Sequence, residues 1–295
     1  MDSTHMIGKL IFCLLPVTLA AEPARQEKFL SNGEVKIGVD MTSGGSVFWF
    51  SELPADRNLL NHADRGRFIQ QSYYGQPDGS KWGEKPWRWN PVQGGDYLGK
   101  PARVVESDGT ETQLHVKSVP INWAGGQELD ECRMEEWITL HGKVAEIRFR
   151  FTYSGETTHP AMHQELPAVF IDHALSRMVY YSGEKPWSGE PISSDVPGWP
   201  NESRDISESW AGYVGTDGRG LGVYFPGSKK ATCYRFEGPD GPAGSGCSYF
   251  APIQMLTIKP GFSHEYTVHL TIGTAEEMRS RFGEIKLGKV PAKTP

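Results

Sequence analysis

The sequence predicts an all-β protein, built as a large antiparallel β-sandwich with one short helix near the C-terminus. Apolar and polar residues alternate with a period of two in the clearest segments, which is typical of strands that bury one face. The 34 Gly and 21 Pro separate these segments as turns do. Many strands with almost no helix indicate two packed sheets. Because no repeat or linker divides the chain, we expect one domain over residues 21–295.

The alternation is clearest in residues 144–153 and 266–272, where apolar side chains are interleaved with charged and polar ones. A helix is expected over residues 275–282, which carry acidic residues early and Arg late. The shorter predicted strands are residues 35–40, 47–51, 68–74, 113–119, 133–140, 166–171, 177–182, 210–214, 220–225, 231–237 and 254–259.

The first twenty residues predict a secretory signal peptide. Lys9 precedes an apolar run over residues 10–20, which ends in small residues and is too short to span a bilayer. Translation could also begin at Met6, because residues 1–5 add nothing to such a signal. The alternative, a buried N-terminal strand, fits Pro16 and Lys9 less well. We therefore expect a soluble secreted or periplasmic protein.

Charge, cysteine content and missing motifs argue against several classes of protein. The formal net charge is −6, which is a poor match for nucleic acid or an anionic membrane. Cys233 and Cys247 flank a turn and could form a disulfide, which would leave Cys132 unpaired. Phosphate-loop, dinucleotide, serine-hydrolase and zinc-protease signatures are absent. No metal site is predicted and no cofactor is required, although a divalent cation is not excluded.

Two long polar segments interrupt the strand pattern, at residues 75–99 and 183–209. Segments of this length in a compact domain are usually functional or disordered. The several tryptophans in them argue against disorder. We therefore expect function in these two loops.

The strand over residues 68–74 and the residues before it combine guanidinium, amide and phenol groups, which suit sugar hydroxyls or a carboxylate. The alternative is that the amides bond neighbouring loops. The predicted substrate-binding residues here are Arg65, Arg67, Gln70 and Gln71, and Tyr74 is a candidate base.

Residues 87–96 place indoles beside polar groups, as sugar recognition requires, because sugar rings have apolar faces and a hydroxyl rim. The alternative is a self-packed loop. Residues 57–90 carry six cations against three acids, a local charge of +3 that favours an anionic ligand such as a uronic acid. The candidates are Trp87, Trp89, Asn90 and Gln93 for binding and Asp96 for catalysis.

His163 and Glu165 lie two residues apart and would point the same way on a strand, as a proton-transfer pair would. A plain hydrogen bond or a cation-binding corner is the alternative. Tyr181 and Trp187 open the second long loop and could form the other wall of a cleft, or pack on the rim of the sandwich.

Taken together, residues 65–74, 89–96, 163–170 and 180–187 resemble an uncharacterised secreted bacterial family with the galactose mutarotase-like supersandwich fold. Aldose epimerases and domains of several polysaccharide lyases and glycosidases share that fold. Mutarotases use a His acid with a Glu base, and His163 with Glu165 supplies these residue types. The surrounding residues depart from the mutarotase pattern, and a shared fold does not assign a function.

The favoured function is a secreted enzyme that acts on a polysaccharide, with β-elimination on a uronate-containing glycan ahead of hydrolysis. Elimination needs a base, His163 or Tyr74, and groups that hold the uronate carboxylate. The candidates for holding it are Arg67, Gln70, Gln71 and Asn90. Hydrolysis would use Asp96 with Glu165. The alternatives are a non-catalytic carbohydrate-binding protein, which would stack sugars on Trp87, Trp89 and Tyr74, and a structural sandwich without a ligand.

Overall fold

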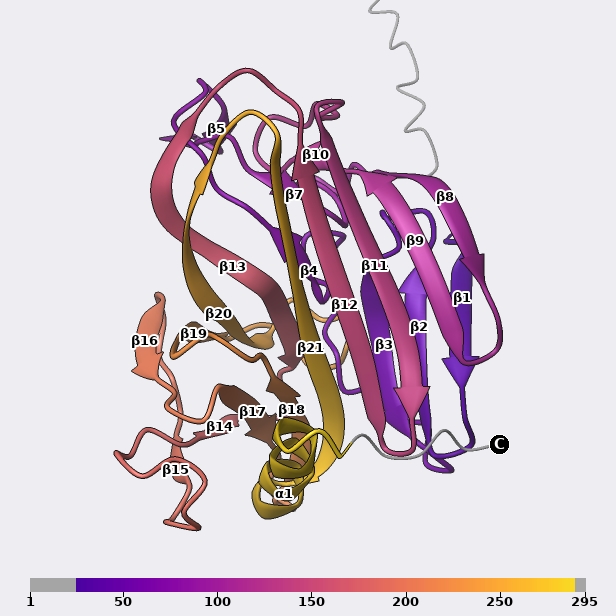
Figure 1. Ribbon diagram of the computed structural model, residues 1–295, viewed down its shortest axis with the longest axis vertical. Helices are drawn as coiled ribbons and strands as arrows, with labels where there is room; N and C mark the ends of the chain where they lie inside the picture. The colour runs from indigo at the N-terminus through magenta and orange to yellow at the C-terminus, as the bar shows by residue number, and fades with distance from the viewer. Residues whose placement is uncertain (1–24, 290–295) are drawn as a thin grey trace, which may run out of the picture.

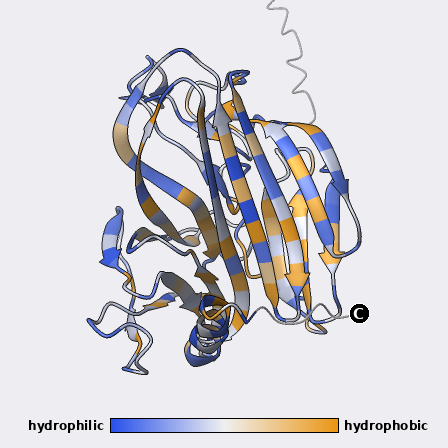
Figure 2. Ribbon diagram, viewed as in Figure 1, coloured by the Kyte–Doolittle hydropathy of each residue, from blue (hydrophilic) through white to orange (hydrophobic). Residues whose placement is uncertain are grey.

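The computed structural model describes residues 25–289, and the predicted signal peptide lies outside them. The two clearest alternating segments form neighbouring strands, β12 (Val144–Tyr153) and β21 (Phe262–Thr274). Along β12 the apolar side chains are buried and the charged ones are half-buried, because successive side chains point to opposite faces. Figure 2 shows this alternation along β12 and the neighbouring β11 (Cys132–His141).

These strands form the centre of a nine-stranded antiparallel sheet, in the order β15-β14-β17-β18-β21-β12-β11-β9-β8. The remaining strands of this sheet are β8 (Arg103–Gly109), β9 (Gln113–Val119), β14 (Arg177–Tyr180), β15 (Ser193–Asp195), β17 (Trp210–Val214) and β18 (Arg219–Tyr224).

A second layer packs against this sheet (Figure 1). It contains a seven-stranded sheet in the order β10-β7-β4-β13-β20-β19-β16 and a three-stranded sheet, β1-β2-β3. Val47 and Ile69 form a bridge that connects the two sheets of this layer. The strands are β1 (Glu27–Ser31), β2 (Val35–Asp40), β3 (Val47–Glu52), β4 (Gln70–Ser72), β7 (Pro91–Val92), β10 (Ile121–Asn122), β13 (His159–Asp172), β16 (Glu202–Asp205), β19 (Lys230–Phe236) and β20 (Cys247–Ile258).

The main hydrophobic core lies between the two layers. Phe50 of β3 and Phe250 of β20 belong to the same buried cluster as Ile147 of β12 and Val268 of β21. Burial of apolar surface between two sheets is the dominant stabilising contribution in such a sandwich. The all-β sandwich predicted from the alternation is therefore confirmed.

Helix α1 (Ala275–Lys286) follows β21 directly and is longer than predicted. It begins at Thr274, whose side chain accepts a hydrogen bond from the Glu277 backbone while the Glu277 carboxylate accepts one from the Thr274 backbone. Met278 and Phe282 bury its inner face against the sheet. Within residues 25–289, no helix has the length and apolar character that a membrane span needs.

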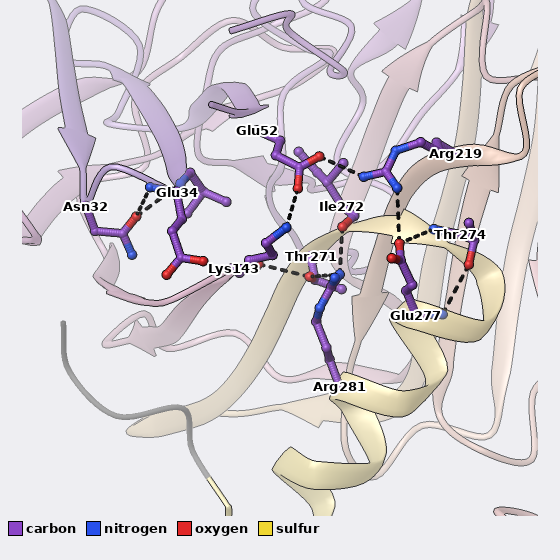
Figure 3. Close-up of polar contacts among 11 residues, drawn as sticks. Asn32, Glu34, Glu52, Lys143, Arg219, Thr271, Ile272, Thr274, Glu277 and Arg281 are labelled. Atoms are coloured by element: carbon purple, nitrogen blue, oxygen red, sulfur yellow. Dashed lines mark hydrogen bonds and ion pairs between the residues drawn. The ribbon is translucent and has the colours of Figure 1, made fainter. Parts of the chain in front are cut away.

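A network of ion pairs connects α1 to both layers (Figure 3). Glu52 of β3 binds Arg219 of β18 at 2.7 Å and Lys143 at 2.8 Å. Arg219 also binds Glu277 of α1 at 3.2 Å. Burial acts to raise the pKa of Glu52, but hydrogen bonds from Lys143 and Arg219 outweigh it, so that the pKa is lowered. The network thus favours the charged form of the carboxylate.

The disulfide that the sequence leaves open between Cys233 and Cys247 is not formed, because the two residues do not lie opposite each other on their neighbouring strands. In the pairing of β19 with β20, Cys233 is opposite Phe250 and Cys247 is opposite Phe236. Both thiols are buried and free, as is that of Cys132.

The two segments that the sequence predicts as long loops contain short strands. Residues 75–99 contain β7 and a small hairpin of β5 (Lys81–Trp82) and β6 (Lys85–Pro86). Residues 183–209 contain β15 and β16, which pair with different sheets. Both segments therefore contribute strands to the main sheets, β7 and β16 to the seven-stranded sheet and β15 to the nine-stranded sheet.

Candidate functional site

A cleft of about 350 Å³ lies on the outer side of the seven-stranded sheet. Its floor includes Gln70 and Ser72 of β4 and Glu165 of β13. Because side chains alternate along a strand, Gln71 and Tyr73 point the other way, into the sandwich. Gln71 accordingly donates to the backbone oxygen of Glu135 in β11, at 3.1 Å.

One wall of the cleft is a cluster of four aromatic side chains, Trp82, Trp87, Tyr97 and Trp123. The ring centroids of Trp82 and Trp87 are 5.6 Å apart, and that of Trp123 lies 5.4 and 5.2 Å from them. Tyr97 contacts Trp123 at 5.5 Å. Asn90 fixes Trp87, because its side-chain oxygen accepts a hydrogen bond from the indole nitrogen at 3.2 Å. We call this cluster the tryptophan wall.

The opposite wall is formed by Phe170, Trp199, Tyr234 and Tyr249. Tyr249 packs on Phe170 at 4.7 Å and stacks on Tyr234 at 4.5 Å between ring centroids. Trp199 and Tyr234 form a T-shaped pair with ring centroids 4.9 Å apart. We call this cluster the tyrosine wall. A floor of polar groups between two aromatic walls suits a ligand with apolar faces and a polar rim, as a sugar has.

Glu165 is the central titratable group of the floor. The Tyr74 hydroxyl donates a hydrogen bond to its carboxylate at 2.7 Å. Burial raises the pKa of Glu165, and hydrogen bonding from Tyr74 and Tyr249 opposes that rise only in part. The pairing of β13 with both of its neighbours shifts register just after Glu165. Such bulges often re-aim side chains beside active sites.

The tyrosines around Glu165 are neutral donors. Burial and then the charge of Glu165 raise the pKa of Tyr74 well above its ordinary value of 10.0. Burial, Glu165 and other neighbours raise the pKa of Tyr249 in the same way. The floor therefore combines a carboxyl group whose pKa is shifted toward neutrality with phenols that keep their protons.

A second carboxyl group, that of Asp64, lines the cleft beside Arg67. The two side chains form an ion pair at 3.2 Å, and Arg67 also donates to the backbone oxygen of Ser245. Burial raises the pKa of Asp64, although Arg67 and the Gly66 amide oppose the shift. Burial is the main cause that raises the pKa of the Tyr234 hydroxyl, and the charges of Glu165 and Asp64 add to it. The two carboxyl groups therefore share one cleft.

Six of the predicted site residues line this cleft: Arg67, Gln70, Tyr74, Trp87, Asn90 and Glu165. The side-chain amides of two of them already form hydrogen bonds within the protein. Gln70 donates to the Gly66 oxygen and accepts from the Gly94 amide, both at 2.8 Å. The Asn90 side chain donates to the Tyr73 oxygen at 2.7 Å. These amides therefore shape the floor of the cleft.

Four predicted polar residues are buried outside the cleft, where their contacts are structural. Arg65 donates to Thr42 and Ser43. Gln71 faces the interior, and Gln93 donates to Glu136 at 2.9 Å. The Asp96 carboxylate accepts the Leu98 and Lys100 amides at 2.9 and 2.7 Å and so closes a turn.

Four further candidates also lie elsewhere. Trp89 is only 6% exposed and stacks on His159 at 3.9 Å. His163 lies on an exposed part of β13, opposite Met255 of β20.

The other two candidates lie near α1, Trp187 within the second long segment and Tyr181 just before it. Tyr181 donates to Glu190 at 2.6 Å, and Trp187 packs against Tyr224 with centroids 6.0 Å apart. The second segment reaches the cleft through Trp199 and Asn201 instead.

Several cleft residues were not singled out in the sequence, namely Asp64, Trp123, Phe170, Tyr234 and Tyr249. One signal was available for Tyr234, because Tyr234 and Phe236 share the outward face of the predicted strand over residues 231–237. Trp123 follows a two-residue strand that has no pattern of its own. Within residues 25–289, His, Cys, Asp and Glu side chains form no group of three that could hold a metal ion.

No protein-family model and no curated protein sequence matches the chain. Three of the similar solved structures come from bacteria. A galactose mutarotase-like protein from Lactobacillus casei has 10% identity and a TM-score of 0.55, over 84% of this chain and 100% of that chain. A galactose mutarotase related enzyme from Lactobacillus acidophilus has 9% identity and a TM-score of 0.53, over 85% and 98%. A galactose mutarotase-like protein from Clostridium acetobutylicum has 10% identity and a TM-score of 0.51, over 85% and 96%.

At these identities the likeness concerns the arrangement of the strands. The similar region covers most of this chain and almost all of each of the three others. The chain therefore has the galactose mutarotase-like fold, as its sequence resemblance predicts.

Proposed function

We propose that this chain is a carbohydrate-active enzyme that binds a sugar in the aromatic cleft and uses Glu165 to transfer a proton. One observation carries the proposal: a half-buried carboxyl group with a raised pKa lies on the cleft floor, hydrogen-bonded by a neutral tyrosine. General acids and bases work best when their pKa lies near the working pH. The two aromatic walls supply the surfaces on which a sugar ring stacks.

Glycoside hydrolysis is the reaction that the cleft supports best. Hydrolysis requires one carboxyl group as the acid and a second carboxylate about 5–10 Å away as base or nucleophile. Glu165 suits the acid, because burial favours its protonated form. Asp64 is the second carboxyl group of the cleft, and the charges of both carboxylates contribute to the raised pKa of Tyr234. The proposed pair is therefore Glu165 with Asp64, since Asp96 closes a turn outside the cleft.

β-Elimination is the second candidate, favoured by the presence of Arg67 in the cleft. Its guanidinium group could bind the carboxylate of a uronic acid, which elimination requires. The base would then be Glu165, because the raised pKa of Tyr74 makes that phenol a poor base near neutrality. This route keeps an anionic glycan as the substrate. Arg67 would have to give up part of its pairing with Asp64.

Incubation of the purified protein with a panel of neutral and uronate-containing polysaccharides tests the proposal. New reducing ends without an unsaturated product support hydrolysis. Reducing ends together with ultraviolet absorbance from an unsaturated sugar support elimination. Binding without either product would reduce the proposal to a carbohydrate-binding protein. The absence of both binding and product would overturn the proposal.

We also propose that the protein is exported, to the periplasm or beyond the cell. The support is the sequence alone, in which Lys9 precedes the apolar run over residues 10–20. Fractionation of cells that produce the tagged chain should find it outside the cytoplasm, with an N-terminus near residue 21. Retention of full-length chain in the cytoplasm would contradict export.

A further inference from the structure

Two exposed tryptophans stand in different parts of the cleft lining. Trp82 belongs to the β5–β6 hairpin and is 38% exposed. Trp199 comes shortly before β16 and is 56% exposed. Figure 1 shows β5 near the top of the molecule and β16 well below it along the longest axis. The cleft therefore extends between two elements that are far apart, with an exposed indole contributed from each.

Trp199 is exposed but held in place. It packs edge-to-face with two rings of β19, with ring centroids 4.9 Å from Tyr234 and 5.3 Å from Phe236. The strand that follows it pairs with β19, where Glu202 lies opposite Cys233. The Asn201 side chain also donates to Thr232 of β19 at 3.1 Å. A fixed indole loses little further conformational freedom when a ligand stacks on it.

Trp82 is held in a similar way at the other end. Trp87 and Trp123 contact it at 5.6 and 5.4 Å between ring centroids. The turn before the hairpin is tied to β10, because Asn122 donates to Asp78 at 2.6 Å. Lys85 lies 5.4 Å from the centre of the Trp82 ring. Both exposed indoles are therefore braced by other aromatic rings.

We infer that the cleft binds a chain of several sugar units, with Trp82 and Trp199 stacking on units on either side of the one held at Glu165. The inference rests on the proposed function. It adds that the ligand is several sugar units long and that it runs along the cleft from Trp82 to Trp199. A single sugar ring held over Glu165 would leave exposed apolar surface on both indoles. A linear oligosaccharide covers this surface and keeps its hydroxyl rim in water. The enzyme would consequently attack bonds within a chain.

Calorimetric titration of the full-length protein with two series of probes tests this inference. The probes are disaccharides and hexasaccharides of the cello-oligosaccharide and oligogalacturonate series. We expect a hexasaccharide to bind at least tenfold more tightly than its disaccharide, a difference of about 1.4 kcal/mol. Trp199→Ala should remove most of this difference, because it should weaken hexasaccharide binding far more than disaccharide binding. Trp82→Ala should act in the same direction.

Val196→Ala is the matched control, because Val196 lies in the same segment and is 54% exposed but does not line the cleft. It should leave both affinities unchanged, and melting curves should show all variants folded. Equal affinities for the two lengths, or a hexasaccharide affinity that survives both tryptophan substitutions, would overturn the inference while the proposed function stands. Failure of every probe to bind would overturn the proposed function itself.

Discussion

The cleft around Glu165 and a second cavity near α1 have similar volumes, about 350 and 310 Å³. The pKa of the glutamate in each is shifted in opposite directions. In the second cavity, Glu52 is bound by two cations within 2.8 Å, and its pKa is lowered. In the cleft, Glu165 is bound by the neutral hydroxyl of Tyr74, and its pKa is raised. The same kind of side chain thus has a lowered pKa in one place and a raised pKa in the other.

The difference separates a structural role from a chemical one. A carboxylate between cations contributes to the stability of the fold and has little tendency to take up a proton. A carboxyl group that is buried among neutral groups costs stability when ionised, and in return its pKa is shifted toward neutrality. We therefore regard the cavity near α1 as a structural connection between the two layers, which we call the joint. The cleft is the reactive site.

The largest expected effect is on turnover, and it tests the reactive side of the comparison. Glu165→Gln keeps the shape of the side chain but removes its titratable proton, so turnover should fall by about 10²–10⁴-fold. Product formation from the polysaccharide found in the substrate panel measures this. Glu156→Gln, at an exposed position, and His163→Ala, outside the cleft, are the controls and should leave turnover unchanged. Equal losses in all three variants would contradict the assignment.

A third carboxyl group sharpens the comparison, because Glu136 of β11 lies inside the sandwich. Burial raises its pKa from 4.5 to about 8, and Gln93 donates to it. Between these values the folded chain holds the proton and the unfolded chain does not. The contribution of Glu136 to the free energy of unfolding should thus be largest below pH 4.5 and fall by about 1.4 kcal/mol per unit up to about pH 8, as an upper limit.

Urea unfolding at a series of pH values measures this effect, with Glu136→Gln as the comparison. The glutamine variant should lose much of the decline between pH 4.5 and 8. If the two proteins show the same pH dependence, Glu136 is not protonated in the folded state.

A smaller effect is expected on ligand binding through the tryptophan wall. Trp87→Ala removes an indole that lines the cleft and contacts Trp82 and Trp123. The affinity for a bound oligosaccharide should fall by about tenfold. Trp137→Ala is the matched control, since Trp137 stacks with Arg148 at 3.9 Å on the nine-stranded sheet. Calorimetry should find the control unchanged, and a similar loss in both would show that the effect is not local.

The smallest effect is expected at the joint near α1. Arg219→Ala removes the ion pairs with Glu52 and Glu277. These side chains are partly exposed, so screening by water limits the loss of unfolding free energy to about 1 kcal/mol. Urea unfolding measures it, with Arg177→Ala at an exposed position of β14 as the control. A loss of sugar turnover in Arg219→Ala without a loss of stability would break the division between joint and reactive site.

Much of the fold is predictable because alternation is a local property of the chain. It identified β12 and the inner part of β21 directly. It missed the first half of β13, residues 159–165, where Pro160 and His163 interrupt the apolar pattern. Strands of two residues, such as β7 and β10, are too short to show a period and form through pairing with neighbouring strands.

The candidate site is predictable only in part, because the same polar residue types line clefts and satisfy buried backbone. Gln70 and Gln71 are neighbours in sequence, yet one lines the cleft and the other bonds the interior of the sandwich. Period two separates their faces, but only the packing of the layers decides which face is outside. Tyr234 and Tyr249 reach the cleft through the pairing of β19 with β20, which no local pattern predicts.

The protonation of Glu165 tests the account most directly. The carboxyl carbon can be followed by NMR during a pH titration and assigned by its absence from the Glu165→Gln protein. We expect a pKa above the ordinary value of 4.5, because burial penalises the charged form. A pKa at or below 4.5 would mean that the cleft holds a charged carboxylate, and it would contradict the proposed proton transfer.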